Sequence, residues 1–244
     1  MAVTTIGRTT LTGQGVAIRG ELRVRKVPTW DGDKVVRFAG PDDEGRFSLA
    51  NQLLGTGISE RFGLYLPRRW VVVVPNRIAQ VAGWTSKLTH LFGAGMDDDP
   101  AFAAELDNEL VIAGKRPIAS GESVLASLVV LDWLRMGDHV GHNFAFKDGQ
   151  IIPTDFASAP PEDAWRSASP SPPTGEDSGG LRAELGRVKP EESTAVLRRF
   201  DRIDEIALGR IMNRIPDEMT EGLGANVIKV LMDRRAEVRD AYWP

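Results

Sequence analysis

Three polar residues in one stretch of the sequence have the types and spacing of a phosphotransfer site. Asp138 is followed five residues later by Asn143, and twelve residues after that by Asp155, which directly precedes Phe156. In kinases an aspartate accepts the proton of the acceptor hydroxyl, while an asparagine and a second aspartate hold magnesium against the phosphates. A carboxylate and an amide oxygen suit Mg²⁺, a hard cation that prefers oxygen ligands. The pattern predicts phosphoryl transfer, with Asp138 as the catalytic residue and Asn143 and Asp155 as metal ligands.

A β-hairpin is predicted between Asn143 and Asp155. Apolar residues at 144–146 and 150–153 flank Lys147, and the Asp148-Gly149 pair that follows it favours a tight turn. The second strand of this hairpin would return beside the asparagine and deliver Asp155 just past its end. The catalytic loop is therefore expected to span residues 137–157.

A strongly apolar helix is predicted upstream of that loop. Ser120 is a candidate N-cap for a helix from about Glu122 to Met136, because a serine hydroxyl accepts a hydrogen bond from a backbone N–H of the first turn. The apolar residues of this segment occur nearly all round the helix, which indicates burial. Gly137 would end the helix and lead into Asp138.

The composition is that of an ordinary globular protein. The chain has 244 residues, of which 42% are hydrophobic and 26% charged, and its net charge of −4 provides no basic field to attract nucleic acid. The absence of cysteine excludes disulfides, thiolate chemistry and cysteine-bound zinc. No run approaches the ~18 apolar residues of a membrane span, and the first residues lack the pattern of a secretory signal. We expect a cytoplasmic protein that binds neither membrane nor nucleic acid directly.

The order of the remaining elements predicts an α+β, two-lobed, protein-kinase-like fold. Residues 15–40 alternate like strands and contain an Asp-Gly turn, residues 48–62 have helical periodicity, and Trp70–Val74 forms an apolar strand. These segments would form a small β-rich N-lobe over residues 1–83, which carries the nucleotide-binding sheet and one helix. The expected C-lobe, residues 84–244, is mostly helical, and its core candidates after Leu181 are Leu197, Phe200, Ile203, Ile206, Ile211 and Ile215.

A segment rich in Pro, Ser, Gly and acidic residues, 158–180, is predicted to be flexible. It directly follows the predicted metal-binding aspartate, where kinases place a regulated loop. Its hydroxyl residues are candidate phosphorylation sites, with Arg166 or Arg182 near enough in sequence to bind an added phosphate. An unregulated linker is the alternative. Three arginine pairs, Arg68–Arg69, Arg198–Arg199 and Arg234–Arg235, are expected on solvated faces.

The sequence resembles the HipA-like kinase family, bacterial relatives of the eukaryotic-type protein kinases and phosphatidylinositol kinases. One block that carries the resemblance comprises Val35-Val-Arg-Phe38, Leu49-Ala-Asn-Gln-Leu53 and Phe62-Gly-Leu-Tyr-Leu-Pro67. The other comprises Asp138-His-Val-Gly-His-Asn-Phe144 and Ile152-Pro-Thr-Asp-Phe156. The similarity extends over most of residues 20–244.

The resemblance implies ATP and Mg²⁺ as cofactors and assigns five residues to the site. Asp138 would be the catalytic aspartate, and Asn143 and Asp155 would hold magnesium. Arg37 stands at the position of the family's phosphate-gripping lysine, and Gln52 at the position of the glutamate that pairs with this lysine. Arginine keeps its charge and binds phosphate bidentately, but the lysine–glutamate ion pair is absent.

Two classes of function follow from this reading. The first is an ATP- and Mg²⁺-dependent kinase of HipA-like type that modifies a protein Ser or Thr hydroxyl, its protein substrate unidentified. The second is a pseudokinase, an interaction module that regulates a partner, which Arg37 and Gln52 favour. Phosphorylation of a small molecule is a third possibility.

Overall fold

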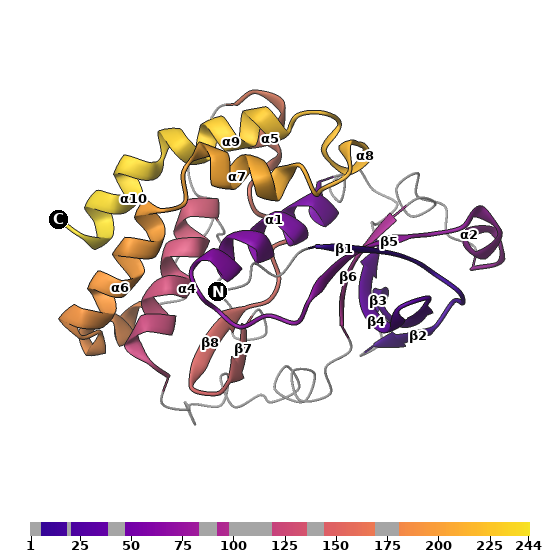
Figure 1. The fold of residues 1–244 in the computed structure, drawn as a ribbon, viewed down its shortest axis with the longest axis horizontal. Coiled ribbons are helices and arrows are strands. Elements are labelled where there is room, and N and C mark those ends of the chain that lie inside the picture. The colour runs from indigo at the N-terminus through magenta and orange to yellow at the C-terminus, as the bar shows by residue number, and fades with distance from the viewer. Residues whose placement is uncertain are drawn as a thin grey trace.

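The computed structural model describes residues 6–18, 21–38, 47–82, 92–97, 119–135, 144–168 and 181–244. It confirms the α+β class, with a mixed sheet built mainly from the N-terminal part of the chain and a mostly helical remainder (Figure 1). The sheet lies on one side of the molecule and the C-terminal helices on the other, with α1 between them. None of the helices in these ranges is long and apolar enough to cross a membrane.

Six strands form the mixed sheet in the order β1-β5-β6-β4-β3-β2. Only β1 and β5, among the paired strands described, run parallel. The strands are β1 (Gly7–Thr10), β2 (Val16–Ile18), β3 (Glu21–Thr29), β4 (Gly32–Phe38), β5 (Arg69–Val73) and β6 (Phe92–Asp97). β3 and β4 form the predicted hairpin, with Gly32 at a φ of 90° after the turn, a value that favours glycine. Because β6 belongs to this sheet, the sheet extends past residue 83, where the sequence predicts the N-lobe to end.

The register of the central strands determines which residues face the helices. Arg37 on β4 lies opposite Ala94 on β6, and Ala94 lies opposite Val71 on β5. Ala94 and Val71 belong to the core shared with α1 and α4, whereas Val36 and Phe38 belong to a smaller core on the opposite face of the sheet. Since side chains alternate along a strand, Arg37 lies on the face turned toward the helices.

The helices and a separate hairpin make up the rest of the described chain. The hairpin consists of β7 (Phe144–Lys147) and β8 (Gln150–Pro153), and its turn residues Asp148 and Gly149 have φ values of 51° and 76°, as the Asp-Gly signal predicts. The helices are α1 (Ser48–Arg61), α2 (Asn76–Ala82), α4 (Gly121–Leu134), α5 (Glu162–Arg166), the 3-10 helix η4 (Arg182–Arg187), α6 (Pro190–Asp201), α7 (Glu205–Met212), α8 (Asp217–Thr220), α9 (Gly224–Asp233) and α10 (Arg235–Tyr242).

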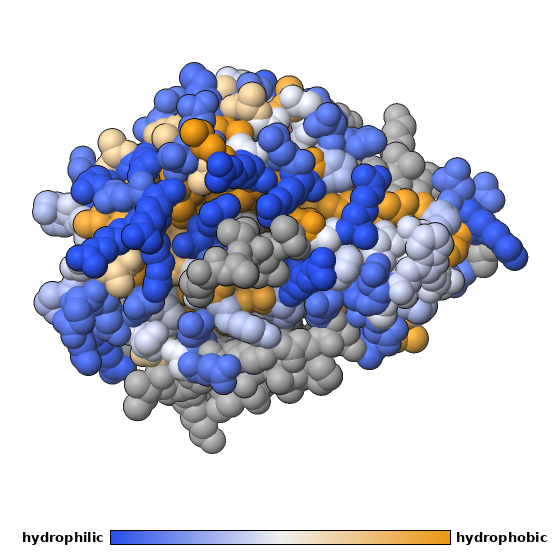
Figure 2. Space-filling model, viewed as in Figure 1, coloured by the Kyte–Doolittle hydropathy of each residue, from blue (hydrophilic) through white to orange (hydrophobic). Residues whose placement is uncertain are grey.

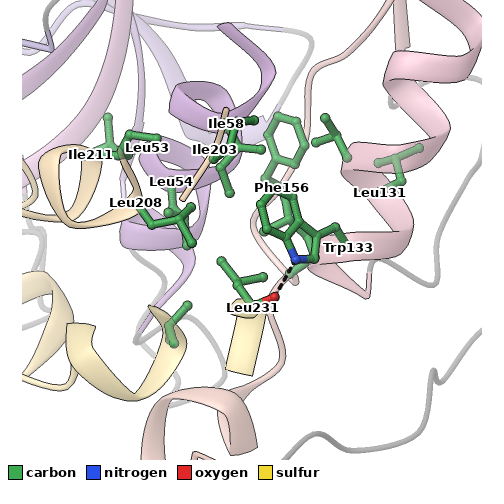
Figure 3. Packing of buried hydrophobic residues seen from close by; sticks show 14 of the residues in the cluster. Leu53, Leu54, Ile58, Leu131, Trp133, Phe156, Ile203, Leu208, Ile211 and Leu231 are labelled. Atoms are coloured by element: carbon green, nitrogen blue, oxygen red, sulfur yellow. Dashed lines mark hydrogen bonds between the residues drawn. The ribbon is translucent and has the colours of Figure 1, made fainter. Parts of the chain in front are cut away.

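The main core surrounds α1 and α4. Figure 3 shows Leu53 and Leu54 of α1 beside Ile211 and Leu208 of α7, and Ile58 of α1 beside Ile203. On the α4 side, the indole of Trp133 is buried and donates a hydrogen bond of 2.7 Å to the carbonyl oxygen of Leu231 in α9 (Figure 3). Hydrophilic side chains dominate the face shown in Figure 2, over the same helices. The helices therefore bury their apolar sides against α1 and α4 and expose their polar sides.

Several predictions about this helical part need correction. Ile206 is 65% exposed and is not a core residue. Helix α4 begins at the predicted cap, since the hydroxyl of Ser120 accepts a hydrogen bond from the N–H of Ser123, but it ends at Leu134, before the predicted Gly137. Arg135 adopts the left-handed conformation there, with a φ of 58°.

The beginning of the segment predicted to be flexible packs against the protein. Residues 162–166 form α5, and Trp165 on this helix is fully buried. Its ring stacks on Phe47, with 4.9 Å between ring centroids and 2° between planes. Residues 169–180 of the predicted flexible segment lie outside the described residues.

Two arginines expected on solvated faces are buried. Arg69 is 5% exposed and Arg234 is 7% exposed. Charged side chains usually lie at the surface, but Arg234 donates to the carbonyl oxygen of Asp132, which is 102 residues away in the sequence.

Candidate active site

An ion pair joins the sheet to the chain that follows the β7–β8 hairpin. Arg37 reaches from the helix-facing side of β4, and its Nη2 donates a hydrogen bond of 2.7 Å to Oδ2 of Asp155. The two side chains are 26% and 33% exposed. The structure thus brings together two of the predicted site residues that are 118 positions apart in the sequence. Both remain accessible enough to exchange partners.

Gln52 positions the backbone on both sides of Asp155. Its Nε2 donates to the carbonyl oxygen of Thr154 at 2.7 Å, and its Oε1 accepts from the N–H of Phe156 at 3.0 Å. The side chain is 7% exposed. A glutamate at this position would be acceptor-only when ionised and would leave the Thr154 carbonyl unpaired. The structure therefore gives a physical reason for an amide here, which differs from the ion-pairing position that the resemblance implies.

Asn51 fixes the chain just beyond Asp155, a contribution that the sequence analysis missed. Its Nδ2 donates to the carbonyl oxygens of Ala157 and Pro160, both at 3.0 Å, and its Oδ1 accepts from the indole N–H of Trp165 at 2.9 Å. The sequence feature that could have indicated this role is the adjacent polar pair Asn51-Gln52 in an otherwise apolar part of the helix. In the structure this helix is buried along most of its length. Buried polar side chains need partners, and these two find theirs in one segment.

Close packing holds Phe156 against α1. A Cβ atom built on Gly55 would lie 2.3 Å from Cγ of Phe156, so no side chain fits between helix and ring. Phe156 is fully buried. The residue after Asp155 is thus fixed by a hydrogen bond from its N–H and by its ring, and Asp155 is left between two anchored neighbours.

Helix α4 holds strand β8 in place through two serines. Ser127 Oγ donates to the carbonyl oxygen of Ile151 at 2.8 Å, and the N–H of Ile151 donates to Ser123 Oγ at 3.1 Å. These bonds satisfy both backbone groups of one residue of β8. The strand that leads to Asp155 is consequently attached to the helix that leads toward Asp138.

Asp138 and Asn143, the other two predicted site residues, lie outside the described residues. The described chain stops at Arg135 and resumes at Phe144. Phe144 pairs with Pro153 across the hairpin, two residues before Asp155. The roles of Asp138 and Asn143 stay predictions.

The surroundings of Asp155 suit a hard cation. Oδ2 accepts from Arg37, and Oδ1 accepts from the N–H of Ala157 at 3.0 Å. A carboxylate offers about four lone-pair positions, so two hydrogen bonds leave room for a metal ligand bond. In the ranges that the structure describes, no three His, Asp or Glu residues gather in a metal-binding group. Asp155 is the described member of the predicted donor set, and its joint binding of Mg²⁺ with the Asn143 amide stays a prediction.

Comparison with known proteins identifies a similar fold. The sequence matches no protein-family model, and no curated protein matches it. Among solved structures, it is similar to a Helicobacter pylori proinflammatory kinase, CtkA, with a TM-score of 0.50 and 15% sequence identity. The match covers 96% of this chain and 99% of that one. At this identity the likeness concerns the fold alone: the chain has a kinase-like architecture, with an N-terminal sheet and a helical remainder.

Proposed function

We propose that the chain is an ATP- and Mg²⁺-dependent phosphotransferase of HipA-like type, with a protein Ser or Thr hydroxyl as acceptor. The observation that carries this proposal is the meeting of Arg37 and Asp155 at 2.7 Å between the sheet and the hairpin. A cation on the sheet and an acid on the chain after a hairpin are the two groups that a kinase-like fold needs on either side of the phosphates. The fold and the spacing of Asp138, Asn143 and Asp155 add support.

Each proposed site residue has a chemically suitable role. Asp138 would accept the proton of the attacking hydroxyl. Asn143 and Asp155 would hold magnesium, which when bound neutralises charge on the phosphates. Arg37 would then exchange the Asp155 carboxylate for phosphate oxygens, to which guanidinium donates bidentately. Gln52 would act as a positioning residue for Asp155, through the Thr154 and Phe156 backbone.

A pseudokinase is the second candidate, and the same ion pair favours it. The Arg37 guanidinium donates to one carboxylate oxygen of Asp155, the predicted metal ligand. If the pair persists in the presence of nucleotide, Asp155 is a poor magnesium ligand and the fold serves as an interaction module. The two candidates differ in whether magnesium displaces Arg37.

Calorimetry and intact mass would test the proposal. Purified protein is titrated with ATP with and without Mg²⁺, and its mass is measured after incubation with Mg·ATP, beside Asp155→Ala and Asp138→Ala. We expect Mg²⁺-dependent ATP binding that is lost in Asp155→Ala, and a gain of phosphate that is lost in both variants. Asp148→Asn removes one charge at the exposed tip of the same hairpin, in a conformation that asparagine tolerates, and should behave as the wild type.

The outcomes separate the candidates. ATP binding without phosphate gain, on the chain or on an added protein, would favour the pseudokinase. Absence of ATP binding would overturn both forms of the nucleotide proposal.

A further inference from the structure

Trp165 anchors helix α5, which follows Asp155 in the chain, to the body of the protein. Its side chain is fully buried, and its ring stacks on Phe47, the residue that directly precedes α1. Helix α5 lies beside α9 (Figure 1), and the carbonyl oxygen of Trp165 accepts a hydrogen bond of 2.7 Å from Nδ2 of Asn226 in α9. The helix is therefore held from two sides, at the indole ring and at the backbone.

The indole N–H of Trp165 determines how the side-chain amide of Asn51 is oriented. The N–H donates to Oδ1 of Asn51 at 2.9 Å, and an indole nitrogen can only donate. The Nδ2 end of the amide then faces the carbonyl oxygens of Ala157 and Pro160, which can only accept, each at 3.0 Å. Asn51 is 3% exposed, and all three of these partners lie on the chain that follows Asp155.

Ala157 connects this arrangement with the carboxylate of Asp155. Its carbonyl oxygen accepts from Asn51, and its own N–H donates to Oδ1 of Asp155 at 3.0 Å. The other carboxylate oxygen, Oδ2, accepts from Arg37 at 2.7 Å. Three hydrogen bonds in series therefore lead from the buried indole to the predicted metal ligand.

We propose that Trp165 is a positioning residue for Asp155, and that the docking of α5 leaves Oδ2 as the carboxylate oxygen presented to Mg²⁺. This role rests on the proposed phosphotransferase function. Because the backbone N–H of Ala157 engages Oδ1, the carboxylate has Oδ2 with which to exchange Arg37 for a metal ion. A ligand group that is held in one orientation loses less conformational freedom on binding, so groups that orient a metal ligand raise its affinity for the metal.

The contribution of Trp165 differs from that of Gln52. Gln52 holds the backbone on both sides of Asp155, at Thr154 and Phe156. Trp165 acts one residue later, through the peptide groups that engage the carboxylate itself. Loss of the indole N–H should therefore alter the orientation of the carboxylate while Gln52 still holds the backbone.

Trp133 provides a matched control for the loss of a buried indole N–H. It is also fully buried, and its N–H donates to the carbonyl oxygen of Leu231 at 2.7 Å. This acceptor belongs to α9 and not to the chain that follows Asp155. Phenylalanine at either position keeps an aromatic ring and removes the donor. Trp165→Phe and Trp133→Phe thus remove the same kind of hydrogen bond, which leads to Asp155 in one case only.

Calorimetric titration with ATP at a series of Mg²⁺ concentrations would test this role. The wild type, Trp165→Phe and Trp133→Phe are compared at a temperature at which thermal unfolding curves show all three to be folded. We expect the Mg²⁺ concentration that gives half-maximal ATP binding to rise about ten-fold in Trp165→Phe, the effect of losing a group that orients a metal ligand. The Mg²⁺ requirement of Trp133→Phe should equal that of the wild type, because a loss of packing or stability alone does not change it.

Asn226→Ala tests the docking of α5 without a change to the indole. This substitution removes the hydrogen bond to the carbonyl oxygen of Trp165 at a half-buried position. We expect a rise in the Mg²⁺ requirement that is smaller than that of Trp165→Phe, because the bond to Asn51 remains. Should Trp165→Phe not fold, Asn226→Ala decides the matter, and an unchanged Mg²⁺ requirement in this variant would exclude the positioning role.

The outcomes separate this role from the function on which it rests. If the wild type binds ATP with Mg²⁺ and Trp165→Phe has the same Mg²⁺ requirement, or if Trp133→Phe shows an equal rise, Trp165 is a structural residue and the phosphotransferase proposal stands. ATP binding by the wild type that is independent of Mg²⁺ would also overturn the positioning role. A wild type that binds no ATP at any Mg²⁺ concentration would overturn the proposed function, and the positioning role with it.

Discussion

Arginine occurs next to the candidate active site in two settings that differ in what faces the guanidinium. Arg37 meets the Asp155 carboxylate at 2.7 Å, so its charge is balanced within the chain. Arg135 and Arg234 instead carry buried N–H donors that no acceptor in the described ranges satisfies. The first arrangement stabilises the fold and must open for a ligand to enter, whereas the second leaves buried donors without acceptors, which costs stability.

The largest effect is expected from Gln52→Glu, which disturbs the support of the paired site. The substitution removes the donor to the Thr154 carbonyl and places a charge at a position that is 7% exposed. We expect a loss of about 3 kcal/mol in the free energy of unfolding, measured by urea denaturation. Gln52→Glu should also lower kcat more than it raises KM for ATP, because Asp155 loses its position.

The reverse outcome would make Gln52 part of an ion-pairing position. If Gln52→Glu were as stable as the wild type and more active, the carboxylate would be pairing with Arg37 as in the lysine–glutamate arrangement. The positioning role would then be wrong.

Gly55→Ala tests the same support by steric means. An added Cβ would lie 2.3 Å from Cγ of Phe156, so ring or helix must shift, at a cost of about 2 kcal/mol for overpacking. Gly209→Ala is the matched control in α7, where nothing lies within 4 Å of the added atom. It should stabilise the protein by up to about 1 kcal/mol, because alanine favours helix. Equal thermal midpoints for the two variants would contradict the packing argument.

Local sequence signals were sufficient for the elements around the site. The cap at Ser120, the Asp148-Gly149 turn and the helix that became α1 were all predicted. Strand β6 was missed because Gly93 and Gly95 disfavour a strand assignment. In the fold these glycines allow close contact, since a Cβ on Gly93 would lie 2.5 Å from Cγ1 of Val36.

Contacts between distant residues could not be read from the sequence. The spacing of Asp138, Asn143 and Asp155 predicted a site, of which only Asp155 lies in the described residues, and no local pattern reveals that Arg37 pairs with Asp155. The burial of Arg234 was missed for the same reason: its acceptor, the Asp132 carbonyl, lies 102 residues away. Local patterns record which face of an element is apolar, whereas individual polar contacts depend on tertiary packing.

Neutralising the two kinds of arginine should change stability in opposite directions. Arg37→Gln leaves the part-buried Asp155 without its cation, and we expect a loss of about 1–2 kcal/mol. Arg135→Gln removes buried donors that have no acceptor, and we expect a gain of about 0.5 kcal/mol. Urea denaturation of both variants would measure the contrast. Losses of similar size in both variants would remove the distinction between the two settings.

Arg69 combines features of both settings, because the acidic residue Glu60 is near it while some of its N–H donors have no acceptor. It is 5% exposed, and its Nε and Nη2 have no hydrogen-bond partner. Burial raises the pKa of Glu60 from 4.5 to about 7, although the positive charge of Arg69 and two other arginines opposes the shift. Burial also lowers the pKa of Arg69 to about 10, opposed by the charge of Glu60. Glu60 therefore gives this arginine a partner whose charge depends on pH.

Glu60→Gln should reduce the pH dependence of stability. The folded state binds the Glu60 proton more tightly than the unfolded state does, so the stabilisation is complete below pH 4.5 and is lost as the pH rises to about 7. Because the carboxyl is partly exposed, we expect the wild type to lose only about 1 kcal/mol over this range from this group. Urea midpoints at several pH values across it should show a smaller decline for Glu60→Gln than for the wild type. Glu218→Gln, at an exposed carboxylate, should retain the wild-type slope, and an equal slope in Glu60→Gln would exclude Glu60 as its source.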